Sequence, residues 1–221
     1  NYEFCCIVSD ALPDRHALAT GHVIGRWRYE SLEPAGGMLA VGSDSDGEVI
    51  HGYRRIDNIT DEALTRFRDQ GGTVILITNA PRPGATVVKF IDKVGVPHSA
   101  YQGIVSSGDV TRSVMQSRPQ KNVFHIGPER DLPIFDGLGL DFVPLEKADY
   151  VVCTGLNHDE VETPESYRAL LTDIRKRNLF MLCGNPDLVV ERGDKLIYCA
   201  GALADLYASL GGEVLYAGKP H

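Results

Sequence analysis

Short apolar runs alternate along the chain with stretches in which apolar side chains recur at about every third or fourth position. Residues 73–77, Thr-Val-Ile-Leu-Ile, form a nearly uninterrupted β-branched run, which is typical of a central strand in a parallel sheet. Before this run, Leu64 and Phe67 fall on one face of a helix that Thr60 can cap and that Gly71 can end. The segment therefore predicts a helix followed by a central strand.

The same alternation continues over the rest of the chain. The predicted strands are 3–8, 38–43, 100–105, 122–126, 150–154 and 179–183, and the predicted helices are 87–94, 163–177 and 201–208. Because helix and strand alternate throughout, the predicted fold class is α/β. The sequence shows neither an internal repeat nor a long linker, so a second domain would have to be inserted through short hinges.

Composition narrows the class of protein. The 221 residues are 43% apolar and 24% charged, values of an ordinary globular protein that exclude a disordered chain or a coiled coil. The net charge of −8, without any cluster of Lys and Arg, argues against nucleic-acid binding. No run approaches the roughly eighteen apolar residues of a membrane span, and no signal peptide pattern is present, so we expect a cytoplasmic protein that does not bind membranes. The five cysteines show no Cys-x-x-Cys spacing, which indicates reduced, mostly buried thiols.

Two aspartates follow directly on the predicted strand 38–43. Asp44 and Asp46 are two positions apart, and Gly47 allows the chain to leave extended geometry there. Two carboxylates that converge in this way can bind a hard cation, or divide into an ionised nucleophile and a partner that carries a proton. An Asp-Gly hairpin turn is the alternative interpretation of the same residues.

Two more strand or loop ends carry polar residues suited to an anion. The central strand ends in Thr78 and Asn79, and ligands of open α/β sheets bind at the carboxyl ends of strands. Near the end of the sequence, Gly218 and Pro220 flank Lys219 in a loop that could enter a helix. A solvated lysine is the alternative interpretation of that segment.

The N-terminal segment 1–37 gives no functional assignment. Asp10 ends a predicted strand as Asp44 does, but Pro13 follows where a phosphate-binding turn would favour glycine. We therefore rank Asp10 below Asp44 as a candidate.

In order and spacing, three of these segments resemble the motifs of the haloacid dehalogenase-like hydrolases, specifically the class IIA branch that includes 4-nitrophenylphosphatase-like enzymes. The three segments are strand-Asp44-x-Asp46-Gly47, strand-Thr78-Asn79 and Gly218-Lys219-Pro220. The resemblance covers roughly residues 38–221, and the stretches 106–111 and 183–187 look like those of an uncharacterised subgroup of that branch. A lone Asp-x-Asp is a weak signal, whereas three motifs in order are a strong one, so the turn interpretation of Asp44 to Gly47 becomes the less favoured.

The resemblance implies roles for five residues. Asp44 would be the nucleophile that forms an aspartyl-phosphate, and Asp46 would act as the general acid and base. Mg²⁺ would be held by the Asp44 carboxylate and the main-chain carbonyl of Asp46. Thr78 would hold the phosphoryl oxygens, Asn79 would lie close to the leaving group, and Lys219 would hold the nucleophile and phosphate charges together.

It also implies a Rossmann-like core with a parallel sheet and an inserted α/β cap domain of the C2 type. We place the cap at residues 112–200 and the core at 38–111 and 201–221, with 1–37 unassigned. The cap would exclude water and contact the leaving group.

Asn185 and Asp187 are the candidate cap residues for that contact, and a structural Asn-Pro-Asp turn is the alternative interpretation. With Gly47 and Asn79, they make up the predicted substrate-binding set.

The predicted function is a Mg²⁺-dependent phosphatase of small phosphorylated metabolites such as sugar or nucleotide phosphates. The alternative is a non-catalytic relative that binds an anionic ligand in the same cleft, and the presence of Asp44, Asp46 and Lys219 favours the enzyme. The family's fourth motif should follow the third, yet the sequence ends at His221, so we expect a C-terminally truncated chain with little activity. The expected partner is a small phosphorylated metabolite, neither nucleic acid nor membrane, and a homodimer is left open.

Overall fold

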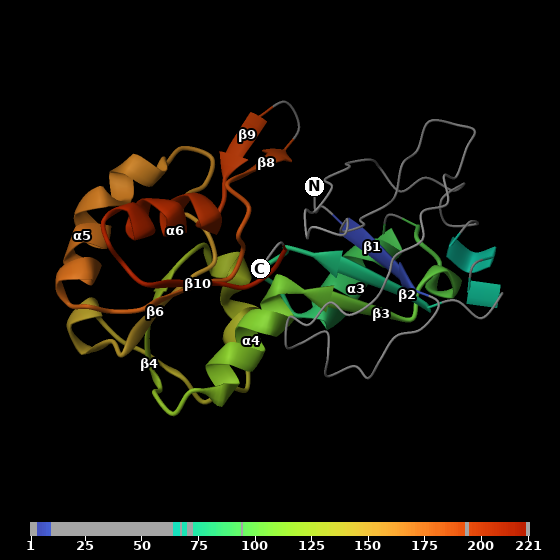
Figure 1. Cartoon of the computed structure of the whole chain (residues 1–221), viewed down its shortest axis with the longest axis horizontal. Coiled ribbons are helices and arrows are strands. Elements are labelled where there is room, and N and C mark those ends of the chain that lie inside the picture. The colour runs from blue at the N-terminus through green and yellow to red at the C-terminus, as the bar shows by residue number, and fades with distance from the viewer. Residues whose placement is uncertain are drawn as a thin grey trace.

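The computed structural model describes residues 4–9, 64–66, 68–69, 73–93, 95–192 and 195–219. Within these residues the strands form three sheets, which are arranged in two lobes (Figure 1). The strands are β1 (Phe4–Ser9), β2 (Thr73–Thr78), β3 (Gly103–Ser106), β4 (Asn122–Ile126), β5 (Asp141–Phe142), β6 (Tyr150–Cys153), β7 (Met181–Cys183), β8 (Val189–Arg192), β9 (Lys195–Tyr198) and β10 (Val214–Tyr216). The α-helices are α3 (Gly84–Lys93), α4 (Ser107–Ser117), α5 (Arg168–Lys176) and α6 (Ala200–Ser209), and the 3-10 helices are η1 (His98–Ala100), η2 (Glu129–Phe135), η3 (Leu145–Lys147) and η4 (Pro164–Tyr167).

The first lobe is built on the sheet β1-β2-β3, in which β2 is central as predicted. β2 runs parallel to β3, with Thr78 opposite Ser106, and antiparallel to β1. Val74 and Leu76 are fully buried on one face of β2, where they pack with Val87 and Ile91 of α3. β1 ends opposite the beginning of β2, at the end of the sheet away from Thr78.

The second lobe is a parallel five-stranded sheet, in the order β10-β7-β6-β4-β5, with helices on both faces. The alternation of side chains along β6 explains the layers. Val151 and Cys153 point into a core with α5 and α6, whereas Tyr150 and Val152 point into a second core with Met115 of α4 and with η2. All four residues of β6 are fully buried, because helices cover both of its faces. The prediction of an α/β fold is confirmed.

α6 and β10 lie in the second lobe. β10 pairs in parallel with β7, and Leu203, Ala204 and Tyr207 of α6 pack against the same core as α5. The sequence-based division assigned residues 201–221 to the core. We propose instead that the inserted cap continues through β10 and that the chain returns to the first lobe at Gly218.

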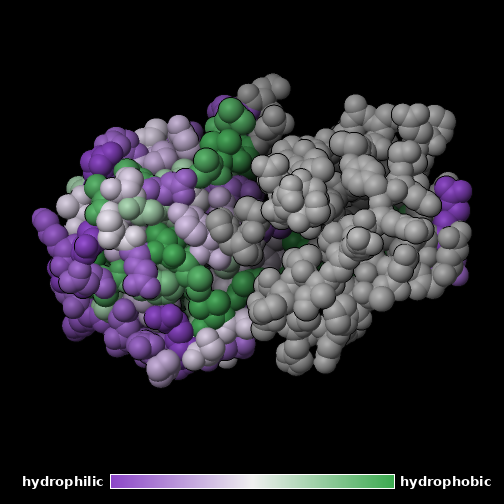
Figure 2. Space-filling model, viewed as in Figure 1, coloured by the Kyte–Doolittle hydropathy of each residue, from purple (hydrophilic) through white to green (hydrophobic). Residues whose placement is uncertain are grey.

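The β8-β9 hairpin stands apart from both larger sheets. It lies between β7 and α6 in the sequence, and the space-filling view shows apolar side chains over it (Figure 2). Leu188, Val189, Leu196 and Tyr198 are the exposed apolar residues here. Among the helices that the structure describes, we find none with both the length and the apolar character needed to cross a bilayer.

Candidate functional site

The loop that follows β2 is fixed against the N-terminus of α4. Ser106 caps this helix by accepting a hydrogen bond from the Asp109 amide at 3.0 Å, and its hydroxyl donates to the Arg82 carbonyl at 2.6 Å. Asp109 also accepts from the Gly84 amide at 3.0 Å. A Cβ on Gly108 would lie 2.3 Å from the Arg82 carbonyl carbon, so only glycine allows this approach. The stretch 106–111 thus positions the loop that carries Asn79.

The side chain of Asn79 joins three segments that are far apart in the sequence. Its amide donates to Asp187 Oδ1 at 2.7 Å and to the Lys219 carbonyl at 3.1 Å, and its Oδ1 accepts from the Lys219 amide at 2.8 Å. Asn79 is 4% exposed, so these bonds are shielded from water. The carboxyl end of β2, the Asn-Pro-Asp segment and the Gly-Lys-Pro segment therefore meet at one point.

Two glycines allow these segments to approach so closely. Gly218 has φ +127°, and a Cβ there would lie 2.6 Å from Asn79 Oδ1. A Cβ on Gly201, at the start of α6, would lie 2.2 Å from the Pro186 carbonyl oxygen. Both positions therefore require glycine on steric grounds.

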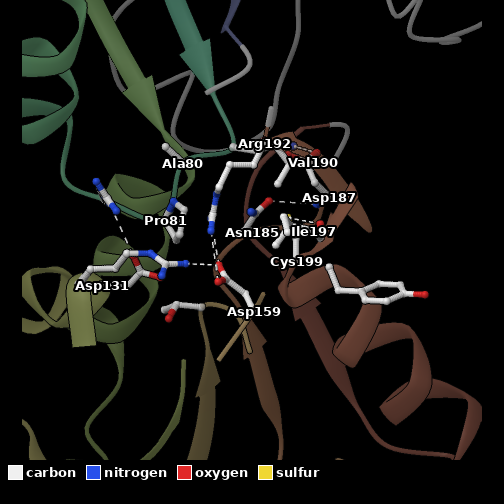
Figure 3. A pocket seen from close by; sticks show the side chains of 16 residues that line it. Ala80, Pro81, Asp131, Asp159, Asn185, Asp187, Val190, Arg192, Ile197 and Cys199 are labelled. Atoms are coloured by element: carbon white, nitrogen blue, oxygen red, sulfur yellow. Dashed lines mark hydrogen bonds and ion pairs between the residues drawn. The ribbon is translucent and has the colours of Figure 1, made fainter. Parts of the chain in front are cut away.

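A cavity of about 330 Å³ opens beside this junction (Figure 3). One wall is the loop after β2, and the others come from the second lobe and its hairpin. The lining residues are Asn79, Ala80, Pro81, Arg82, Arg130, Asp131, Thr154, Gly155, Asp159, Asn185, Asp187, Val190, Arg192, Ile197, Tyr198 and Cys199.

Apart from Asp187, the charged side chains that line the cavity form two groups. Asp159 accepts hydrogen bonds from Arg130 and from Arg192, the latter at 3.0 Å. Burial alone would raise the pKa of Asp159, but the bonds from Arg192 and Arg130 outweigh it and lower this pKa. Asp131 lies 3.5 Å from Arg82 and is 3% exposed, and its burial raises its pKa despite the nearby arginines.

The sequence did not predict these charged residues as part of the site. Asp131 follows β4 and Asp159 follows β6, so both lie beyond the carboxyl ends of parallel strands. That placement is the signal that could have identified them. Arg192 lies instead on β8 and reaches Asp159 across the cavity (Figure 3).

The structure describes five of the eight residues predicted for the site. Three of them line the cavity, namely Asn79, Asn185 and Asp187. The main chain of Lys219 is hydrogen-bonded to Asn79, and Thr78 directly precedes Asn79 in the sequence. Thr78 is 1% exposed, and its hydroxyl accepts from the Ala80 amide at 3.2 Å.

The Asn-Pro-Asp segment forms the turn that was the alternative interpretation of the sequence. Asn185 Oδ1 accepts from the Asp187 amide at 3.0 Å. Because both side chains also line the cavity, the turn and contact with a ligand are compatible.

Asp44, Asp46 and Gly47 lie outside the described residues, so the nucleophile and the metal ligands stay predictions. Among the residues that are described, no group of three or more His, Cys, Asp or Glu side chains could hold a metal ion.

The chain resembles proteins of known family and fold. The profile of the haloacid dehalogenase-like hydrolases matches residues 41–141. A crystal structure of a haloacid dehalogenase-like hydrolase from Brucella suis 1330 is 54% identical, with a TM-score of 0.69, over 73% of this chain and 59% of that one. No protein in the curated set matches significantly.

More distant structures share the fold. The p-nitrophenyl phosphatase from Archaeoglobus fulgidus is 20% identical over 71% of this chain and 59% of its own, with a TM-score of 0.54. The glycerol phosphate phosphatase from Mycobacterium tuberculosis, solved in complex with calcium, is 22% identical over 65% of this chain and 43% of its own, with a TM-score of 0.50. The chain thus spans about three fifths of the Brucella protein and less than half of the Mycobacterium one.

These likenesses confirm the predicted α/β fold with a Rossmann-like core. The identity to the Brucella protein, together with the profile match over the segment that carries Asp44 and Thr78, decides the family. The chain belongs to the haloacid dehalogenase-like hydrolases.

Proposed function

We propose that this protein is a Mg²⁺-dependent phosphatase of small phosphorylated metabolites that works through an aspartyl-phosphate on Asp44. The observation that carries the proposal is the hydrogen-bonded junction at Asn79, where the segments of Thr78 and Lys219 meet beside a polar cavity. The phosphatases of similar fold support the same reaction class.

The chemistry requires positive charge, because a carboxylate must approach a phosphate that is itself anionic. The carboxylate of Asp44 and the carbonyl of Asp46 are hard oxygen donors of the kind that Mg²⁺ prefers. Bound there, Mg²⁺ would supply charge on one side of the phosphoryl group. Lys219 would supply it on the other, and its main chain is fixed at both its amide and its carbonyl by Asn79.

The proposed reaction has two steps, phosphorylation of Asp44 and hydrolysis of the aspartyl-phosphate. Asp44 forms a bond to phosphorus while the bond to the leaving oxygen breaks, and Asp46 gives that oxygen a proton. Asp46 next takes a proton from water, which attacks the phosphorus and releases phosphate from Asp44. The Thr78 hydroxyl, at the carboxyl end of β2, would hold the phosphoryl oxygens in both steps.

We further propose that the second lobe acts as the cap. Its loops form most of the cavity wall, so the leaving group would lie there, shielded from water. Asn185 and Asp187 would contact the leaving group from this side, beside Asn79.

The test is hydrolysis of 4-nitrophenyl phosphate with and without Mg²⁺. Asp44→Asn should abolish Mg²⁺-dependent release while the melting temperature stays unchanged, because an amide cannot form the acyl-phosphate. Asp46→Asn should still allow slow phosphorylation, since nitrophenol is a good leaving group that needs little protonation.

Asp10→Asn serves as the control and should match the wild type. Mg²⁺-dependent activity that survives Asp44→Asn would overturn the assignment of the nucleophile. Binding of phosphate esters without any turnover would support the non-catalytic alternative.

A further inference from the structure

Two arginines on the cavity wall share one carboxylate. Asp159 Oδ2 accepts from Arg130 and, at 3.0 Å, from Arg192, and Asp159 Oδ1 accepts a second hydrogen bond from Arg192 at 3.3 Å (Figure 3). Asp159 is largely buried, with 9% of its side chain exposed. The cluster therefore holds two guanidinium groups at the edge of the cavity, around one largely buried carboxylate.

Both arginines have N–H groups that the contacts within the described part of the chain do not use. Within the described part of the chain, Arg130 donates to Asp159 alone, and the other charged neighbour of Arg192 is the exposed Glu160 at 3.8 Å. A guanidinium has more N–H groups than these contacts use. The side chains of Arg130 and Arg192 are 45% and 42% exposed and line the cavity, so the remaining donors are accessible to a ligand.

The carboxylates of the wall, in contrast, are already engaged. Asp159 is held by the two arginines, Asp131 lies against Arg82, and Asp187 accepts from Asn79. The wall therefore offers the unused N–H donors of the two arginines, and its carboxylates already have partners of their own. A carboxylate or phosphate group on a ligand needs donors only.

We propose that this cavity selects phosphomonoesters whose alcohol carries a second anionic group, a carboxylate or a second phosphate, and that Arg130 and Arg192 bind that group. The inference rests on the proposed function, because it places the phosphoryl group at Thr78 and Lys219 and the alcohol in the cavity. The cavity of about 330 Å³ is at the small end of ligand pockets, so the second anion lies only a few bonds from the ester oxygen. Planar guanidinium groups match carboxylate and phosphate with paired hydrogen bonds.

The test is equilibrium binding by isothermal titration calorimetry to the Asp44→Asn chain, which should not turn the ligands over. Phosphoglycolate is compared with ethyl phosphate, in which a methyl group replaces the carboxylate, and ethane-1,2-diol bisphosphate tests the second phosphate. We expect at least one of the two ligands with a second anionic group to bind about tenfold or more tightly than ethyl phosphate. The ratio between those two ligands identifies which anion the arginines prefer.

Arg192→Gln and Arg130→Gln, each in the Asp44→Asn chain, assign the preference to these residues. Each single change leaves Asp159 bonded to the other arginine, so the fold should persist. We expect each change to reduce the preference for the second anion by about tenfold, while the affinity for ethyl phosphate stays within about twofold. Arg192→Lys should retain more of the preference than Arg192→Gln, because lysine keeps the positive charge but lacks the paired N–H groups of the guanidinium.

Arg168→Gln is the matched control. Arg168, the first residue of α5, pairs with Glu165 and does not line the cavity. Its replacement removes one positive charge away from the cavity and should change neither the affinity for ethyl phosphate nor that for the ligands with a second anion. Equal affinities for phosphoglycolate, the bisphosphate and ethyl phosphate, or a preference that survives both arginine changes, would overturn the proposal.

Turnover is scored separately, with 4-nitrophenyl phosphate and the chain that retains Asp44. A preference for the second anion without any turnover would overturn the phosphatase and leave the ligand class standing. Turnover without a preference for the second anion would support the phosphatase and overturn the proposed ligand class.

Discussion

His125 should make the stability of the second lobe depend on pH. The residue lies in β4, where its Nε2 shares a hydrogen bond of 2.9 Å with Thr154 Oγ1 and its ring packs edge-on against Phe135 at 4.9 Å. Burial lowers the pKa of this histidine from 6.5 to about 4. The folded protein therefore keeps His125 neutral over a range of pH in which the unfolded chain takes up a proton.

The size of the effect follows from the two pKa values. Because the folded pKa lies below the unfolded one, the contribution is complete above about pH 6.5 and is lost as the pH falls towards 4. From about pH 7.5 to about pH 5, the free energy of unfolding should fall by roughly 2 kcal/mol on account of His125. Below about pH 4 the loss levels off near 3 kcal/mol, since both states are then protonated.

The assay is urea denaturation followed by circular dichroism at a series of pH values, for the wild type and for His125→Gln. The glutamine amide can replace the hydrogen bond to Thr154 but takes up no proton, and the other titrating groups cancel in the difference between the two proteins. His98→Gln is the control, because His98 has 71% of its side chain exposed. Parallel pH profiles for wild type and His125→Gln would refute the reasoning.

Two further predictions concern the junction at Asn79. Gly218→Ala should destabilise the protein by about 2 kcal/mol or more, because the new Cβ strains the backbone and also clashes with Asn79. Gly137→Ala is the control: its φ is +73° and the space around it is open, so it should cost only the backbone strain of about 1 kcal/mol. Thermal melts of the two variants measure the difference. Asn79→Asp should place two carboxylates where a hydrogen bond of 2.7 Å joins Asn79 to Asp187, with a loss of roughly 2–4 kcal/mol at neutral pH. That loss should shrink as the pH falls, when one carboxyl of the pair takes up a proton, and a loss that stayed constant with pH would contradict the assigned contact.

Local sequence was enough to find most of the elements in the described chain. The predicted strand 122–126 coincides with β4, and 73–77 falls within β2, where continuous β-branched and aliphatic residues are typical of a central strand. The helix predicted at 201–208 lies within α6. These elements owe their formation to their own apolar pattern, which is visible without knowledge of their partners.

Elements that depend on a distant partner were missed. β10 has only three residues, and its place in the five-stranded sheet comes from pairing with β7 about thirty positions earlier. The β8-β9 hairpin did carry a signal, since the apolar runs 188–190 and 196–198 stand on either side of a Gly-Asp pair, a sequence typical of a hairpin connection. The sequence-based division of domains after residue 200 was drawn without β10, and the boundary that we propose instead follows from its pairing with β7.

The candidate site divides in the same way. Asn79 and Lys219 could be named from motifs, because the chemistry of phosphate binding restricts which residues stand at those places. The Arg130–Asp159–Arg192 cluster could not, because its members are spread over more than sixty positions and belong to no motif. They meet only because the loops after β4 and β6 emerge at one end of the sheet and the hairpin folds over them.

The two connections between the lobes converge on one loop, and this arrangement links the second lobe to the carboxyl end of β2. On the outgoing side, Ser106 and Asp109 at the start of α4 bind the loop at Arg82 and Gly84. On the returning side, Asn79 in the same loop binds Lys219 through both main-chain groups, and it also binds Asp187 of the second lobe. A displacement of the second lobe therefore cannot leave the surroundings of Asn79 unchanged. The buried amide would lose the only acceptor that it has in the second lobe among the described contacts. The position of the second lobe and the placement of Lys219 are therefore energetically coupled through this one side chain.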